Sequence, residues 1–130
     1  MVYQIGQYYE MKKKVTSEEI DKFAEVSGDF NPIHVDEAFA KQSIFGQRIA
    51  HGMLGASYIS TVIGTAFPGQ GTIYMGQNLK FMRPVFLEEE LTIHVELIEM
   101  MEKQKAKLST IVRNSKGETV IEGEALVKLP

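Results

Sequence analysis

The chain contains no cysteine, which excludes a disulfide framework, a thiolate nucleophile and a cysteine-based zinc site. It also has little excess charge: 14 basic and 17 acidic side chains give a net charge of −3, so no basic field is available for nucleic acid. The single basic run, Lys12–Lys14, suits the solvated end of a strand better than a binding patch. We therefore expect no nucleic-acid partner.

Long hydrophobic segments are missing as well. The longest apolar-rich stretch, Met53–Phe67, is interrupted by Gly, Ser and Thr and is too short to cross a bilayer. The N-terminus has no apolar core followed by a cleavage site, so we expect no signal peptide. The length of 130 residues and the hydrophobic content of 44% suit a single domain over residues 1–130. We expect a cytoplasmic protein without membrane contact.

The most informative segment is Ser27–His34, which reads SGDFNPIH and holds a carboxylate, Asp29, five positions before an imidazole. Gly28 can adopt the positive φ that ends a helix, and Pro32 fixes its own φ and pushes the preceding residue out of the helical region. The bend can therefore bring Asp29 and His34 into one space as an acid–base pair. An Asp-capped loop with one hydrogen-bonded structural histidine fits the same residues, and the pattern alone leaves both interpretations open.

Two helices are predicted around this segment. Thr16–Glu19 resembles a capping box at a helix start, with Val15 and Ile20 as a hydrophobic staple, and the helix ends at the glycine of the bend. Asp36 is expected to cap a second, short helix over about residues 37–42.

A third predicted helix, Gly52–Ile63, contains no charged residue. A helix that is apolar almost all round belongs in the middle of a protein, so we expect it to be wrapped on most sides.

The second half of the chain changes to the two-residue period of strands. A first strand is expected at Tyr8–Val15, and later strands at 72–81, 91–99, 105–112 and 118–129, with a turn at 114–117. An antiparallel sheet wrapped around one apolar helix, with short helices before it, is the α+β hot-dog fold. Such a sheet has an open edge strand, which pairing with a second copy would cover, so we expect a homodimer.

With this architecture and the Asp–His bend, the sequence resembles the MaoC-like hot-dog family. Within that family it is similar to the (R)-specific enoyl-CoA hydratases that supply polyhydroxyalkanoate monomers. The resemblance covers essentially the whole chain and is carried by four segments, Ser27–His34, Ala50–Leu54, Phe81–Val85 and Gly123–Pro130. It implies an acyl-CoA substrate, with Asp29 and His34 as the catalytic dyad and the amide of Gly52 binding the thioester oxygen.

The resemblance also implies an acyl pocket lined by Ser60, Ile63 and Leu126. Core packing is the alternative role for all three. If the pocket assignment holds, the branched side chains of Ile63 and Leu126 would close the pocket and favour short acyl groups such as crotonyl.

The chemistry of hydration agrees with these residues. Adding water across a 2-enoyl thioester requires a deprotonated water at the β-carbon, a proton for the α-carbon and support for enolate charge on the carbonyl oxygen. Asp29 and His34 can activate the water and return a proton. Gly52 opens a helix, so its N–H lacks an intrahelical partner and lies at the positive end of the dipole. This scheme requires no metal and no redox cofactor, and it leaves open which member of the dyad acts as base.

Four further residues have less specific signals. Asn31 could orient the dyad or the substrate, although a turn residue in this position is also structural. His51 is expected to position the loop before the central helix, and His94 is expected at the surface of a strand. Arg83 could meet a phosphate of coenzyme A, but a structural ion pair fits it better.

Two other functions use the same fold. An acyl-CoA thioesterase would send water to the carbonyl carbon and release free thiol, which a hydratase does not do. A non-catalytic acyl-thioester binding or dimerisation module would need neither Asp29 nor His34. The presence of both residues together with Gly52 favours the hydratase.

Overall fold

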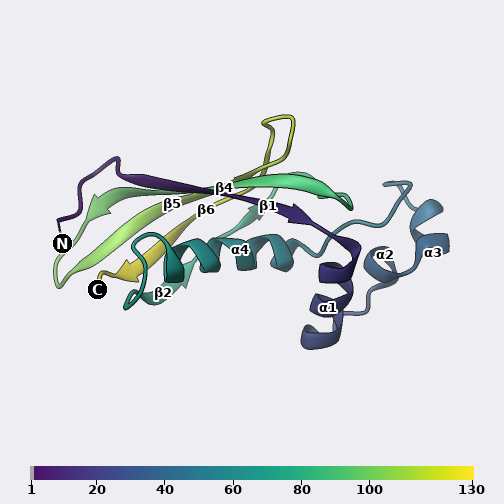
Figure 1. Ribbon diagram of the computed structural model, residues 1–130, viewed down its shortest axis with the longest axis horizontal. Coiled ribbons are helices and arrows are strands. Elements are labelled where there is room, and N and C mark those ends of the chain that lie inside the picture. The colour runs from purple at the N-terminus through teal and green to yellow at the C-terminus, as the bar shows by residue number, and fades with distance from the viewer. Residues whose placement is uncertain (1) are drawn as a thin grey trace.

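The computed structural model describes residues 2–130, and Figure 1 shows a long antiparallel sheet with one helix lying along one of its faces. Three shorter helices gather beyond one end of the sheet (Figure 1). The helices are α1 Ser17–Ser27, α2 Pro32–Val35, α3 Glu37–Lys41 and α4 Gly52–Thr65. The strands are β1 Tyr8–Val15, β2 Ile73–Gln77, β3 Lys80–Phe81, β4 Glu89–Met100, β5 Lys105–Arg113 and β6 Thr119–Lys128.

The sheet has the order β1-β4-β5-β6-β2, and β3 pairs with β6 beyond the end of β2. The strand expected over residues 72–81 is thus divided into β2 and β3, with a register shift between Tyr74 and Gly76. Only one face of the sheet is covered by a helix, so buried residues alternate with half-buried ones in the central strands β4 and β5. The α+β hot-dog fold predicted from the sequence is confirmed.

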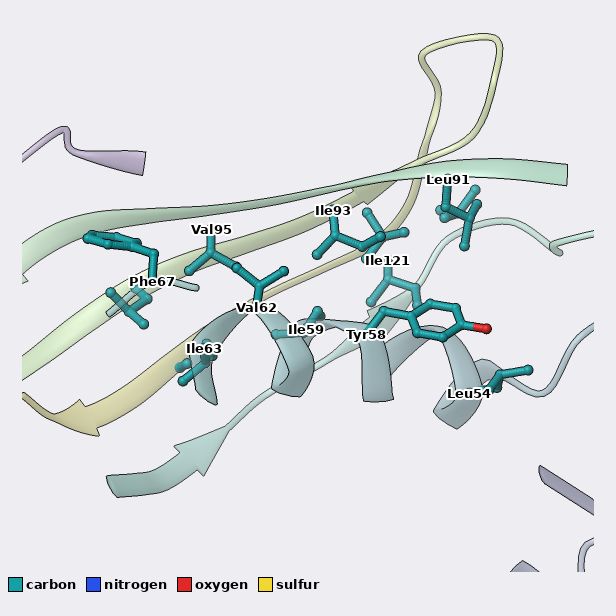
Figure 2. Close-up of a cluster of buried hydrophobic side chains, with 14 of the residues drawn as sticks. Leu54, Tyr58, Ile59, Val62, Ile63, Phe67, Leu91, Ile93, Val95 and Ile121 are labelled. Atoms are coloured by element: carbon teal, nitrogen blue, oxygen red, sulfur yellow. The ribbon is translucent and has the colours of Figure 1, made fainter. Parts of the chain in front are cut away.

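Helix α4 crosses the covered face and contacts strands β1, β2, β4, β5 and β6. Figure 2 shows its buried side chains among those of β4 and β6, with Tyr58, Ile59 and Val62 on the helix. Burying a side chain of this size stabilises the fold by about 1.5–3 kcal/mol. A Cβ on Gly55 would lie 2.8 Å from Ile121 Cδ1, so glycine permits the close approach of α4 to β6.

The expectation that the central helix is wrapped on most sides is wrong for the single chain. The sheet covers one side of α4, and the opposite side is exposed because no other element of residues 2–130 lies over it. The exposed side consists of small or flexible residues, namely Met53, Ser60, Thr61, Gly64 and Thr65.

The two helix starts predicted at Thr16 and Asp36 are confirmed. Thr16 caps α1 by accepting a hydrogen bond from the Glu19 N–H at 3.2 Å, and Asp36 caps α3 by accepting from the Phe39 N–H at 3.0 Å. Gly28 ends α1 with a φ of 80°, which is a left-handed conformation. Between α1 and α3 lies α2, a single helical turn where the sequence predicts only a bend. Within residues 2–130, no helix is long and apolar enough to cross a membrane.

Candidate active site

A cavity of about 520 Å³ lies at the N-terminal end of α4. Its lining includes Asp29, His34, His51 and Gly52. The remainder is mostly apolar and comes from β1, the segment before α4, α4 itself, β3, the β3–β4 connection, β4 and β6. It includes Val15, Phe45, Phe81, Met82, Val85, Leu91 and Ile121. The structure therefore brings the predicted dyad and the predicted oxyanion donor to a single apolar cavity.

His34 lies on α2 with only 9% of its surface exposed. Its Nδ1 lies 2.8 Å from the Ile49 carbonyl oxygen. Because a carbonyl can only accept, Nδ1 carries the proton in the neutral ring and Nε2 is left as the free acceptor. Burial lowers the pKa of His34, and the neighbouring His51 and Arg48 act in the same direction against the Ile49 carbonyl and Asp29. The imidazole is therefore neutral at pH 7, with one nitrogen able to take a proton.

Asp29 lies in the exposed connection between α1 and α2. Its carboxylate accepts a hydrogen bond from the Asn31 N–H at 3.2 Å, which forms a tight local turn. Nitrogen or oxygen atoms of Asp29, His34 and His51 all lie within 4.8 Å of one another. A water molecule bound among these groups could contact both members of the dyad.

Residues 48–51 hold this turn in place from a distant part of the chain. Arg48 donates to the His34 carbonyl through Nε and pairs with Asp21 of α1 at 2.7 Å. The Ile49 N–H donates to the Ile33 carbonyl at 3.2 Å, in addition to the contact with the imidazole. The single turn of α2 is therefore fixed by contacts with this segment and not by its own length.

Gly52 is the first residue of α4, and the side chain of the preceding residue gives it no cap. Its N–H has no partner within the helix and lies at the positive end of the helix dipole. A Cβ at this position would lie 2.7 Å from two ring atoms of Phe81. Only glycine therefore fits here without moving the aromatic ring that covers it.

The group of Asp29, His34 and His51 has the residue types of a metal site but not the geometry. His34 Nδ1 and His51 Nε2 both bond to backbone carbonyls, which leaves one nitrogen on each ring. The two rings stack with centroids 3.9 Å apart and planes inclined by 27°. A metal ligated by imidazole lies near the ring plane at about 2.0–2.1 Å, and two nearly parallel stacked planes do not meet at that distance. The three side chains do not suit a shared metal ion.

Other predicted residues have structural contacts. The Asn31 side chain caps α2 by accepting a hydrogen bond from the Ile33 N–H at 3.3 Å. Arg83 forms the expected ion pair, with Glu118 at 3.4 Å, although it also lines the cavity. His94 lies on the outer face of β4 but is largely covered, because Tyr8 stacks on it and two glutamates flank its ring nitrogens.

The three residues expected in the acyl pocket do not line the 520 Å³ cavity. Ser60 is on the exposed side of α4, and Ile63 is 1% exposed within the core. Ile121 of β6 faces α4, and the register from Ile121 to Leu126 has no bulge, so Leu126 points away from the helix. The structure therefore does not bring Leu126 together with Ser60 and Ile63.

Phe81 and Met82 are cavity residues for which the sequence predicts no individual role. They belong to the segment Phe81–Val85, which carries part of the family resemblance but has no polar group to suggest a role. Their signal is the break in strand pattern before Pro84, which places two apolar side chains at the end of a short strand.

Known proteins share this sequence and fold. The model of the MaoC-like domain family matches residues 2–119. An (R)-specific enoyl-CoA hydratase of Aeromonas caviae is 43% identical over 128 residues, which are 98% of this chain and 96% of that protein. A 3-hydroxybutyryl-CoA dehydratase of Methylorubrum extorquens is 43% identical over 121 residues, covering 92% of this chain and 76% of that protein. The unliganded R-hydratase PhaJ1 of Pseudomonas aeruginosa superposes with a TM-score of 0.96 at 42% identity, over 98% of this chain and 83% of that one.

Proposed function

The chain belongs to the MaoC-like domain family, and from this premise we propose that it is an (R)-specific 2-enoyl-CoA hydratase. This hydro-lyase adds water reversibly to trans-2-enoyl-CoA and gives (R)-3-hydroxyacyl-CoA. The observation that carries the proposal is the meeting of Asp29, His34 and the Gly52 amide at one apolar cavity. Nearly full-length identity of 43% to an (R)-specific enoyl-CoA hydratase supports the same reaction.

In the proposed mechanism, the Asp29 carboxylate and His34 Nε2 hold a water molecule beside C3 of the enoyl group. The dyad takes one proton from the water while its oxygen bonds to C3, and the π electrons move towards the thioester carbonyl. The Gly52 N–H stabilises the negative charge on that oxygen, an effect worth about 3 kcal/mol for one such donor. Return of the proton from the dyad to C2 completes the addition.

The acyl-CoA substrate is proposed to contact two regions of the protein. The thioester and the carbon atoms next to it occupy the cavity beside α4, whose apolar wall suits a carbon chain. Ser60 and Ile63 are proposed to line the far end of the acyl pocket, and Asn31 to hold the dyad loop through its cap on α2.

We also propose a homodimer that forms through the free edge of β2. The other edge strand, β1, carries Lys12 and Lys14 in ion pairs with neighbouring glutamates, and charge of this kind protects an edge against pairing. On β2 the side chains of Ile73, Tyr74 and Met75 are 56%, 39% and 46% exposed and uncharged. An unprotected apolar edge of this kind favours association with a second copy.

The proposed function also includes a cytoplasmic location and a single domain over residues 1–130.

The test is incubation of the purified protein with crotonyl-CoA. We expect loss of the enoyl absorbance, formation of (R)-3-hydroxybutyryl-CoA on a chiral column, and no free thiol in a thiol-reactive dye assay. Release of coenzyme A without hydration would identify a thioesterase instead, and an (S) product would contradict the proposed stereochemistry.

Variants of the dyad connect this activity to the cavity. Asp29→Asn and His34→Gln should each lower kcat by ~10²–10⁴-fold, the usual loss for an acid–base group. The double variant should be little slower than the worse single one, because the two residues act as a unit. Asp36→Asn is the matched control, since Asn caps a helix about as well as Asp and the residue lies outside the cavity. Near-normal turnover in either dyad variant would refute the assigned role of that residue.

A further inference from the structure

We propose that His51 is a positioning residue that holds Asp29, His34 and the Gly52 amide in one fixed arrangement. The inference rests on the proposed hydratase function and assigns a role to a side chain that does not itself react. His51 is 3% exposed and is the N-cap residue of α4, directly before the amide that binds the thioester oxygen. Its backbone is thus tied to the oxyanion donor, and its side chain extends to the dyad.

The side chain contacts each half of the dyad in a different way. Nε2 lies 3.0 Å from the Asp29 carbonyl oxygen, so it donates a hydrogen bond that fixes the backbone of the carboxylate-bearing loop. The ring also stacks on the His34 imidazole, with centroids 3.9 Å apart. Phe23 of α1 packs against His51 at a ring-centroid distance of 4.8 Å and an angle of 58°. His51 is thereby clamped between α1 and α2 and cannot turn without moving the dyad.

The second ring nitrogen of His51 supports a role for the hydrogen bond to the Asp29 loop. Among the described residues 2–130, its Nδ1 is buried without any hydrogen-bond partner. A buried polar atom without a partner lowers stability, and an apolar ring would fill the same space without that penalty. The stabilising contact that offsets the unpartnered atom is the Nε2–H bond to the Asp29 loop, which an apolar ring cannot make.

The contact with His51 also bears on the pKa of His34. The groups that face the neighbouring His34 are His51, Asp29 and Arg48, together with the Ile49 carbonyl. Through the stacked rings, His51 is thus one of the groups that lower the pKa of His34.

The experiment compares His51→Phe, which keeps a stacking ring but has no donor, with His51→Gln, which keeps an amide N–H near the Nε2 position. His94→Gln is the matched control, because that histidine lies on the outer face of the sheet. Steady-state kinetics with crotonyl-CoA, pH profiles of kcat/KM and thermal unfolding are measured for all four proteins, including the wild type.

We expect His51→Phe to lower kcat by ~10–10²-fold, the loss that follows a displacement of about 1 Å near the reacting atoms, with KM little changed. His51→Gln should retain more activity, and its acid limb should move to higher pH because His34 loses a neighbour that lowers its pKa. The two variants should be folded at the assay temperature, and His94→Gln should match the wild type.

An active wild type whose kcat and pH profile are unchanged in both His51 variants would overturn the inference alone. A fall in kcat that only follows the fraction of unfolded protein would overturn it as well, and if His51→Phe does not fold, His51→Gln decides through its pH profile. A wild type without hydratase activity would overturn the proposed function and this inference with it.

Discussion

Replacing Gly52 by alanine adds one carbon atom, Cβ, and tests whether the Gly52 amide binds the thioester oxygen. The added Cβ would lie 2.7 Å from two atoms of the Phe81 ring and 3.3 Å from a third. Carbon atoms prefer separations of about 3.5–4.0 Å, so the ring must move by roughly 1 Å. Phe81 is 52% exposed, and a half-exposed ring at the end of a short strand can swing outwards.

The effects on stability and on activity should therefore differ in size. Overpacking usually costs about 1–3 kcal/mol, and the freedom of Phe81 places this change near the lower limit. For activity, loss of one oxyanion donor corresponds to ~10²–10³-fold in kcat. The methyl group of Gly52→Ala lies beside the amide that the thioester oxygen must approach, so we expect a loss approaching this range.

The assay is crotonyl-CoA hydration together with thermal unfolding, with Gly64→Ala as the matched control. Gly64 is on the same helix, and a Cβ there meets nothing within 4 Å. That variant should keep full activity and gain about 0.5–1 kcal/mol of stability from the loss of a helical glycine. The Gly52→Ala/Phe81→Ala double variant should recover stability but remain slow. A Gly52→Ala enzyme with the kcat of the wild type would refute the placement of the thioester oxygen at this amide.

Three further predictions concern pH, assembly and the acyl pocket. The pKa of His34 is lowered from 6.5, so its neutral form persists to below pH 6.5. The value of kcat/KM should therefore be constant around neutral pH and fall only at more acidic pH. A fall that begins above pH 6.5 would contradict this prediction. Tyr74→Lys on β2 should shift a dimer towards monomer in light scattering, whereas Tyr9→Lys on the charged edge should not, and equal behaviour of the two would exclude the β2 edge. Leu126→Ala should leave the preference for enoyl chain length unchanged because the side chain points away from α4, whereas Ile63→Ala should extend it and cost about 2–5 kcal/mol of stability.

Much of the fold could be predicted because its signals are local. The cap at Thr16, the left-handed glycine at position 28 and the alternation of β4 each depend on a few neighbouring residues. The dyad could be predicted for the same reason, since Asp29 and His34 lie within one bend. Their approach to Gly52 could be predicted only from the family resemblance.

The features that could not be predicted depend on contacts between distant segments. The stacking of His51 on His34 joins residues 17 positions apart in the chain, and no periodicity encodes it. The position of Phe81 over Gly52 depends on where β3 ends against β6. The direction of Leu126 depends on the strand register, because a shift of one residue exchanges the two faces of the sheet. The open side of α4 could not be foreseen because apolar composition predicts burial but does not say which element supplies the cover.

The dependence of α2 on residues 48–51 has a consequence for how the protein loses activity. A single helical turn has almost no stability of its own, so the catalytic loop is held by a few hydrogen bonds to this segment, whereas the sheet and α4 share an extended core. Regions with few buried contacts open at lower free energy than the global unfolding transition. Inactivation by denaturant should therefore precede the loss of strand structure, and amide protons of residues 29–35 should exchange faster than those of β4 and β5. The enzyme would then have a folded, inactive state from which activity returns without refolding of the sheet.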